Sequence, residues 1–297
     1  MGRPATKDIG TLSTLISQLR AQTEFRLGTP VESVVVATPS MTGLDWRDIR
    51  EAINCAGLKS LHDDTYLLAQ APETSAAFAA NGHGLCQDYV NPYVCEDEED
   101  EMPTEMVLAV RCVQISPTAI LYSNKANPLI ISFTKRVLHL ALVPMRLAMS
   151  NTEDRHVFDW SAGLEALPSH PSADAYWDHV RDAIKSFVQS TIDFCASRPF
   201  TTVLLLGESA TDPDFLRVLR DTLREIQGSE NPTALNVDKV ADPLYAAARG
   251  AAEFAKRIQE APPHNCIEDK SCARLRLDRG GVPDRAGHGG QPGSDEL

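Results

Sequence analysis

The stretch Val203-Leu204-Leu205-Leu206-Gly207-Glu208-Ser209, followed by Asp212-Pro213, carries the clearest structural signal in the sequence. A short continuous apolar run is typical of a strand that is buried on both faces, as in a sheet covered by helices. Gly207 ends the run, and Asp212-Pro213 is a helix N-cap with proline at the first helical position. The periodic residues that follow predict a helix over 213–227, so the unit is a strand, a turn and a helix of an α/β layer.

The same alternation extends outward from this unit. Asp242-Pro243 repeats the capping device and predicts a second helix from 243 to 258, and apolar spacing predicts a helix over 174–196. Residues 146–172 are polar and contain proline, so a linker or an irregular excursion is expected there. Four apolar runs with short polar connections predict an antiparallel meander, and they lie at Met106–Cys112, Thr118–Tyr122, Leu129–Phe133 and Val137–Val143. We expect the first of these runs to pair with Val203–Leu206.

The N-terminal part also alternates between helix and strand. Helical spacing begins at Ile9, and a β-branched run that Pro39 stops predicts a buried strand over Val34–Thr38. The further elements expected here are a helix from Trp46 to Ala56, a strand over Tyr66–Ala69 and an alanine-rich helix over Thr74–Ala80. We therefore expect an α/β fold of two unequal lobes, with mixed sheets covered by helices.

Composition shifts divide the chain into four segments. Residues 1–82 and 106–262 are expected to form the two lobes. Between them, 83–105 holds six consecutive acids from Glu96 to Glu101, which are typical of a solvated loop. Residues 263–297 are rich in glycine, proline and charge without periodicity, so a disordered tail is expected.

Charge and cysteine usage exclude several classes of function. A net charge of −13 repels phosphate backbones, so no nucleic-acid partner is expected. No apolar run reaches the length of a membrane span and the N-terminus does not resemble a signal peptide, so we expect no membrane partner and a cytoplasmic protein. The seven cysteines are scattered and form no C-x-x-C pair, which favours free, mostly buried thiols and no metal site.

Two N-terminal segments resemble lobe I of the seventy-kilodalton heat-shock chaperones, which belong to the actin-like ATPase superfamily. Leu15 to Leu58 is similar to a helix, a Leu-Gly, a valine-rich strand with proline and a helix that ends in Ala-Gly-Leu. Ala71-Pro72-Glu73-Thr74-Ser75-Ala76-Ala77 stands where that family has Glu-Pro-Thr-Ala-Ala-Ala.

The C-terminal half resembles the same family. Val203 to Ser209 with Pro213 is similar to the strand and Gly-Gly-Ser turn that binds adenosine, and Asp242-Pro243 with Gly250-Ala251-Ala252 is similar to the closing Asn-Pro…Gly-Ala-Ala helix. The order of the motifs is similar to that of filamentous-fungal proteins labelled as actin-like ATPase-domain proteins. The resemblance implies a partial actin-like ATPase (ribonuclease H-like) fold, and Gly207 and Ser209 as the adenosine turn.

The phosphate-binding parts of that family have no counterpart that matches. Its first glycine-rich hairpin precedes the region of resemblance, and its second aligns with Arg111-Cys112-Val113-Gln114-Ile115-Ser116, which lacks the glycines and the carboxylate. Leu244 stands where the family has an acid after Asn-Pro. Since phosphoryl transfer depends on such parts, we expect no catalytic residues and no hydrolysis.

The expected function is that of a degenerate, non-hydrolysing nucleotide-binding-domain protein, a pseudo-ATPase that acts as a binding or regulatory module. No cofactor is expected beyond weak binding of ATP or ADP at the adenosine turn. A protein partner or a homodimer through the incomplete N-terminal lobe is expected. The alternative is an ATP-binding, chaperone-like ATPase that this sequence represents only in part.

Overall fold

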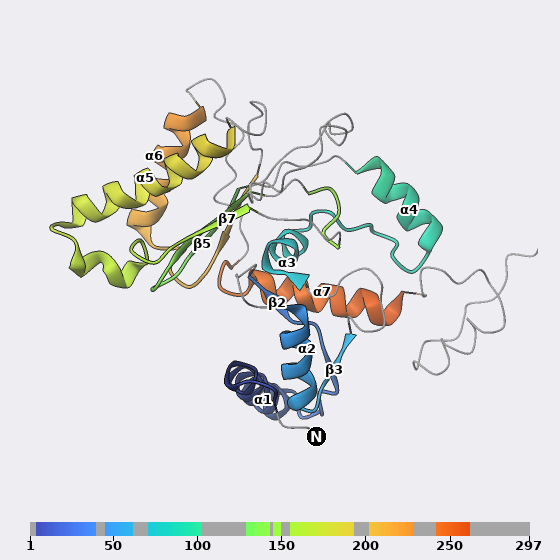
Figure 1. Ribbon diagram of the computed structural model, residues 1–297. Coiled ribbons are helices and arrows are strands. Elements are labelled where there is room, and N and C mark those ends of the chain that lie inside the picture. The colour runs from blue at the N-terminus through green and yellow to red at the C-terminus, as the bar shows by residue number, and fades with distance from the viewer. Residues whose placement is uncertain are drawn as a thin grey trace, which may run out of the picture.

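The computed structural model describes residues 4–39, 45–61, 71–102, 129–142, 145–149, 155–192, 202–227 and 242–261 (Figure 1). Several expected features lie outside these residues: the strands at Tyr66–Ala69, Met106–Cys112 and Thr118–Tyr122, the segment Arg111–Ser116 and the tail 263–297.

A four-stranded mixed sheet forms the centre of the C-terminal part. Its strands are β5 (Leu129–Phe133), β6 (Leu138–Leu142), β7 (Arg155–Asp159) and β8 (Val203–Leu206), in the order β7-β6-β5-β8. β5 and β6 are antiparallel, as are β6 and β7, whereas β5 and β8 are parallel with Ile131 opposite Leu205. The expected antiparallel pairing of Leu129–Phe133 with the following run is confirmed, and the described neighbour of β8 is β5.

Strand β7 corrects the expected linker over 146–172. Its five residues contain two apolar side chains that are adjacent, Val157 and Phe158, so no alternation of apolar and polar residues marks the strand in the sequence. A 3₁₀ helix, Leu164–Ser169, follows β7. Within 146–172, residues 155–159 are therefore a strand of the sheet, and residues 164–169 are the 3₁₀ helix that follows it.

Helices α5 (Ala173–Ile192) and α6 (Pro213–Gln227) cover one face of the sheet (Figure 1). Ile131, Leu140 and Leu205 point into this core, which Tyr176 and Phe215 fill from the helices. The cap at Asp212 is confirmed, because its Oδ1 atom accepts the N–H groups of Asp214 and Phe215, each at 3.0 Å.

Helices α3 (Glu73–Ala80) and α7 (Ala246–Glu260) pack on the opposite face and against each other (Figure 1). Helix α7 begins at Ala246 rather than at the expected Pro243. Asp242 has a left-handed φ of 28°, so its side chain does not cap the helix and Tyr245 is the N-cap residue. Leu204, Phe78 and Phe254 share this core, which joins elements from both expected lobes.

The N-terminal elements are two helices and two pairs of short parallel strands. Helices α1 (Lys7–Leu27) and α2 (Trp46–Cys55) pack together, and Ile49, Ile53 and Leu58 form a small core beside them. The strand expected over Val34–Thr38 is divided into β1 (Ser33–Val34), which pairs with β3 (Lys59–Ser60), and β2 (Ala37–Thr38), which pairs with β4 (Ala71–Pro72).

The acidic run, expected in a loop, lies in helix α4 (Pro92–Glu101). The Asn91 side chain accepts the N–H of Tyr93 at 3.2 Å and proline occupies the first position, so a local cap starts the helix despite its charge. The prediction of free thiols is wrong for two cysteines, since Cys86 and Cys95 form a disulfide, whereas Cys55 keeps its thiol. A pairing that the fold creates cannot be deduced from scattered cysteines.

The chain thus folds as a mixed α/β protein, as expected. Among the helices that the structure describes, none has the length and apolar character needed to cross a membrane.

Candidate functional site

Three turns meet at the carboxyl ends of the parallel strands β5 and β8. The turn after β5 is 134–137, and the turn after β8 is 207–210. The third segment, 242–245, reaches them because the Gly207 N–H donates to the Pro243 carbonyl at 3.2 Å. In open α/β sheets, ligands bind outside the carboxyl ends of the strands, so these turns form the candidate site.

Gly207 and Ser209, the two residues expected to bind adenosine, lie together in the turn after β8. Gly207 has a φ of 96°, a conformation that favours glycine, and its carbonyl accepts the Ala210 N–H at 3.3 Å. Ser209 is buried, and its carbonyl accepts the Asp212 N–H at 3.0 Å. The backbone of the turn thus links the strand to the cap of α6, and the Gly207 N–H has an internal acceptor.

The turn after β5 also satisfies its own N–H groups. The Thr134 N–H donates to the Val137 carbonyl at 3.1 Å, and the Thr134 hydroxyl oxygen accepts the N–H groups of Arg136 at 3.2 Å and Val137 at 3.0 Å. The fourth N–H, from Lys135, donates to Glu208 Oε1 at 3.1 Å. Each backbone N–H of 134–137 therefore has an acceptor within the protein.

The segment after β7 supports this turn from its other side. The Leu164 N–H donates to the Thr134 carbonyl at 3.2 Å, and the Glu165 N–H donates to the Lys135 carbonyl at 2.6 Å. Gly163 lies so close that a Cβ there would stand 2.1 Å from the Arg136 carbonyl carbon. Because backbone packs against backbone here, the turn is held in one conformation.

Glu208 places a negative charge between the two turns, beside the exposed cationic residues Lys135 and Arg136. Its side chain is exposed and connects the two turns, and a carboxylate that accepts a backbone N–H forms a charge-assisted hydrogen bond. The carboxylate occupies the Lys135 N–H, a donor that an anionic ligand would use. An incoming phosphate would have to displace it and would also meet its negative charge.

Two large apolar side chains next to Gly207 are exposed. Leu244 has 52% and Tyr245 56% of its surface exposed. The segment that carries them is fixed by the bond from Gly207 to Pro243. An exposed aromatic ring on a fixed turn can stack on any nucleobase, because every base has a π-face.

A second polar group lies at the carboxyl ends of β2 and β4. Burial raises the pKa of Glu73, the first residue of α3, to about 7. The hydroxyls of Thr38 and Ser75 are buried and make no hydrogen bond in the described part of the chain. Thr38 stands opposite Pro72 in the strand pair, so these groups surround the start of α3. Glu73 is thus a carboxyl that can exchange a proton near neutral pH.

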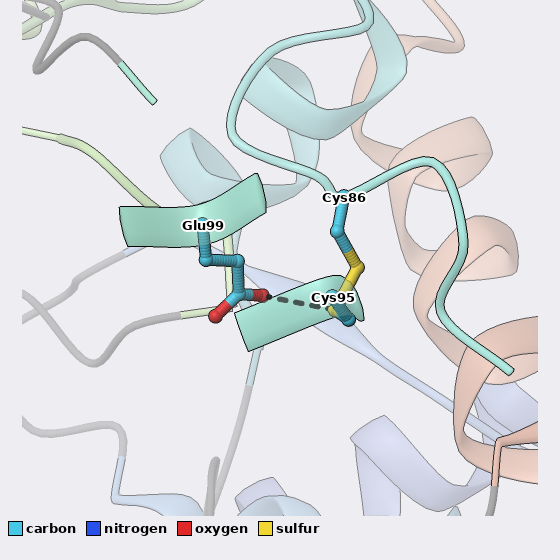
Figure 2. A group of neighbouring side chains, drawn as sticks. All are labelled: Cys86, Cys95 and Glu99. Atoms are coloured by element: carbon cyan, nitrogen blue, oxygen red, sulfur yellow. Dashed lines mark hydrogen bonds between the residues drawn. A yellow bond between two sulfur atoms is a disulfide. The ribbon is translucent and has the colours of Figure 1, made fainter. Parts of the chain in front are cut away.

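Cys86, Cys95 and Glu99 form one cluster of metal-ligating atoms within the described residues (Figure 2). The two sulfurs are bonded to each other, so neither is a thiolate ligand. Structural zinc sites have four protein ligands, and this cluster offers three donors. The cluster does not fit a metal centre while the disulfide is intact.

The turn at 134–137 was not expected from the sequence, because the resemblance aligns the family's second phosphate hairpin with Arg111–Ser116, which lies outside the described residues. Among the described residues, the hairpin that connects β5 to β6 lies beside the turn after β8, where the Lys135 N–H donates to Glu208. A usable signal was Thr134-Lys135-Arg136 between two apolar runs, because a threonine that starts a turn often caps it with its hydroxyl.

No protein-family model matches the chain, and no match is found among curated proteins. Function therefore has to be inferred from the chemistry of these turns.

Proposed function

We propose that this chain is a degenerate nucleotide-binding-domain protein of the actin-like ATPase and heat-shock chaperone type, which does not hydrolyse ATP and acts as a binding or regulatory module. Two segments that carry the resemblance support this proposal by their packing. Ala76, from the Glu-Pro-Thr-like segment, touches Gly250, from the closing Gly-Ala-Ala segment. Val203 to Ser209, the third segment, ends a strand of the mixed sheet at the candidate site.

The bond from the Lys135 N–H to Glu208 is the observation that carries the proposal. Nucleotide phosphates are held by backbone N–H groups that glycine leaves accessible. In the turn at 134–137 those groups have internal acceptors, and one acceptor is itself an anion. The backbone N–H groups of this turn therefore bond to acceptors within the protein rather than to a triphosphate.

The remaining ligand surface suits the nucleoside end of a nucleotide. Gly207 and Ser209 supply the turn, and the exposed ring of Tyr245 supplies a stacking face. Without phosphate contacts, we expect a dissociation constant near 1 mM, or roughly −4 kcal/mol. ATP and ADP should bind no more tightly than adenosine, because the nucleoside is the part that is recognised and the Glu208 carboxylate repels phosphate.

Calorimetric titration of the full chain with ATP, ADP and adenosine, each with magnesium, tests this function. A parallel assay measures magnesium-dependent phosphate release. We expect no release above background and weak binding of all three ligands, which Tyr245→Ala abolishes. Tyr93→Ala, a change of another exposed tyrosine, should leave binding unchanged. ATP binding far tighter than adenosine binding, or phosphate release that Ser209→Trp abolishes, would contradict the proposal.

We propose that helix α1 in the N-terminal segment is the surface that binds a protein partner. Leu15 and Leu19 of α1 are 52% and 55% exposed on adjoining turns. Sedimentation analysis with and without Leu15→Glu and Leu19→Glu tests whether a second copy or another protein binds here. We expect the wild-type chain to associate with itself or with a co-purifying protein, and the double variant to be monomeric. A wild-type chain that is monomeric and has no co-purifying protein would argue against this role.

A further inference from the structure

Within the part of the chain that the structure describes, helix α4 has few contacts with other elements. Cys95 is its single buried residue, and the helix lies at the periphery in Figure 1. Beyond the disulfide, Asp100 pairs with Arg146 at 2.8 Å on the surface, and Glu98 accepts the Gln87 N–H. Exposed ion pairs of this kind contribute about 0–1 kcal/mol, so the disulfide is the main attachment of the helix.

The sequence of α4 does not favour a helix by itself. Ten residues are too few for a stable isolated helix in water. Six acids from Glu96 to Glu101 repel one another at spacings of three and four residues. They also lie near the C-terminal end, where the helix dipole disfavours anions, and no basic residue occupies the last turn. The helix therefore depends on whatever holds Cys95 in place.

The other half of the disulfide is anchored firmly on α7. Arg257 Nη1 donates to the Cys86 carbonyl at 2.8 Å, and the Arg257 guanidinium lies 4.5 Å from the centroid of the Tyr89 ring. The Tyr89 hydroxyl also donates to Glu260. Because the segment around Cys86 stays on α7 without the S–S bond, cleavage of that bond would separate α4 from a fixed anchor.

Opposite charges flank the two sulfurs. Arg257 Nη1 lies 3.6 Å from Cys86 Sγ, and Glu99 Oε1, which Figure 2 shows, lies 3.6 Å from Cys95 Sγ. A guanidinium stabilises a thiolate, so Cys86 is suited to leave as the anion when the bond breaks. A protonated Cys95 thiol can donate a hydrogen bond to Glu99, which the disulfide cannot do. The surroundings thus stabilise both products of reduction.

We propose that Cys86–Cys95 is a reversible thiol–disulfide exchange site that controls the attachment of the acidic helix α4 to the segment around Cys86, which α7 holds. The co-reactant is a small or protein dithiol. Its first thiolate attacks Cys95 Sγ, and the electron pair of the S–S bond passes to Cys86 Sγ beside Arg257. Its second thiol then attacks the mixed disulfide, so the dithiol is oxidised to a disulfide and Cys95 is released. Of the two protons of the dithiol, one passes to Cys95 and one to solvent. The proposal is independent of nucleotide binding.

Hydrogen exchange with mass spectrometry, on the full native chain before and after dithiothreitol, tests the proposal. Non-reducing peptide mapping first establishes the bond between Cys86 and Cys95. We expect amides of 92–101 to lose at least about tenfold in protection on reduction, while α7 and the four-stranded sheet keep theirs. Re-oxidation with oxidised dithiothreitol should restore protection. A chelator in every buffer excludes metal capture by the reduced cluster.

Variants separate the role of this disulfide from that of other thiols. Cys86→Ser combined with Cys95→Ser should leave 92–101 unprotected even under oxidising conditions. Cys55→Ser should behave as the wild-type chain in this assay, since Cys55 is not part of the Cys86–Cys95 disulfide. Three results would overturn the proposal: protection of 92–101 that survives reduction, a disulfide that dithiothreitol cleaves only after denaturation, or loss of protection throughout the protein.

Discussion

Gly250 of α7 lies directly against the backbone of Ala76 in α3. A Cβ atom built at Gly250 would stand 1.7 Å from the Ala76 carbonyl oxygen. The neighbours of this contact, Ala77, Ala246 and Ala251, are buried and small, so the two helices approach closely. Since α3 belongs to the N-terminal part and α7 to the C-terminal part, this crossing joins the two.

We expect Gly250→Ala to destabilise the protein by about 2–4 kcal/mol, because the methyl group meets rigid backbone and the helices must separate. Alanine would otherwise stabilise a helix interior relative to glycine by about 1 kcal/mol. Gly10→Ala in α1 is the matched control, since its Cβ would lie 3.3 Å from the Pro4 side chain. Urea unfolding should show loss for the first variant and little change or a gain for the second. Equal effects would mean that α3 and α7 do not cross as described.

Glu73→Gln should stabilise the protein at pH 8 more than at pH 4. Burial raises the pKa of Glu73 to about 7 from 4.5, so its stabilising contribution is fully present below pH 4.5 and is lost as pH rises to about 7. Glutamine avoids that loss, which we put at about 2 kcal/mol for a half-buried carboxyl. Thermal unfolding across this range measures the difference. Glu32→Gln, at an exposed site, should show no such trend.

His139 should make the protein sensitive to acid. Burial, together with the neighbouring His156, lowers the pKa of His139 to about 3 from 6.5. The unfolded chain therefore binds a proton below pH 6.5 that the native state does not bind until about pH 3, and stability falls as pH falls through this window. His139→Leu should reduce the slope by up to about 1.4 kcal/mol per pH unit. Identical slopes for the two proteins in urea unfolding would disprove this assignment.

Local signals were sufficient for part of the fold. Val203–Leu206 and the cap at Asp212 were predictable because a buried strand and an N-cap depend on adjacent residues. The same dipeptide at Asp242-Pro243 predicted a helix cap that the structure does not have. There the Pro243 carbonyl instead accepts the N–H of Gly207, a residue far away in the sequence. A dipeptide cannot show which of these two roles it has.

The candidate site was only partly predictable for the same reason. Gly207 and Ser209 were proposed as site residues because their segment resembles the adenosine turn of the chaperone family. The partner turn at 134–137 was not, because the bond from Lys135 to Glu208 joins residues 73 positions apart. The Cys86–Cys95 disulfide was missed as well, since both cysteines needed the cap at Asn91 to bring α4 against the preceding loop.

Two features of the candidate site weaken phosphate binding: the negative charge of Glu208 and the internal hydrogen bonds of the turn at 134–137. Glu208→Gln removes the first and keeps the second. Glutamine keeps an oxygen that can accept the Lys135 N–H, so the turn should retain its conformation, but the negative charge is gone. If charge repulsion dominates, ATP should bind up to about tenfold tighter, which corresponds to about 1.4 kcal/mol. Adenosine affinity should not change, because adenosine has no phosphate.

Glu96→Gln on α4 is the control, because it changes the net charge by the same amount as Glu208→Gln. It should leave the affinities for ATP and adenosine unaltered. Phosphate release should remain at background in every variant, since the N–H groups of Arg136 and Val137 still donate to Thr134. Calorimetry on the three proteins decides the matter. Two results would show that the Glu208 carboxylate does not specifically repel phosphate from this turn. One is a gain in adenosine affinity for Glu208→Gln, and the other is an equal gain in ATP affinity for Glu96→Gln.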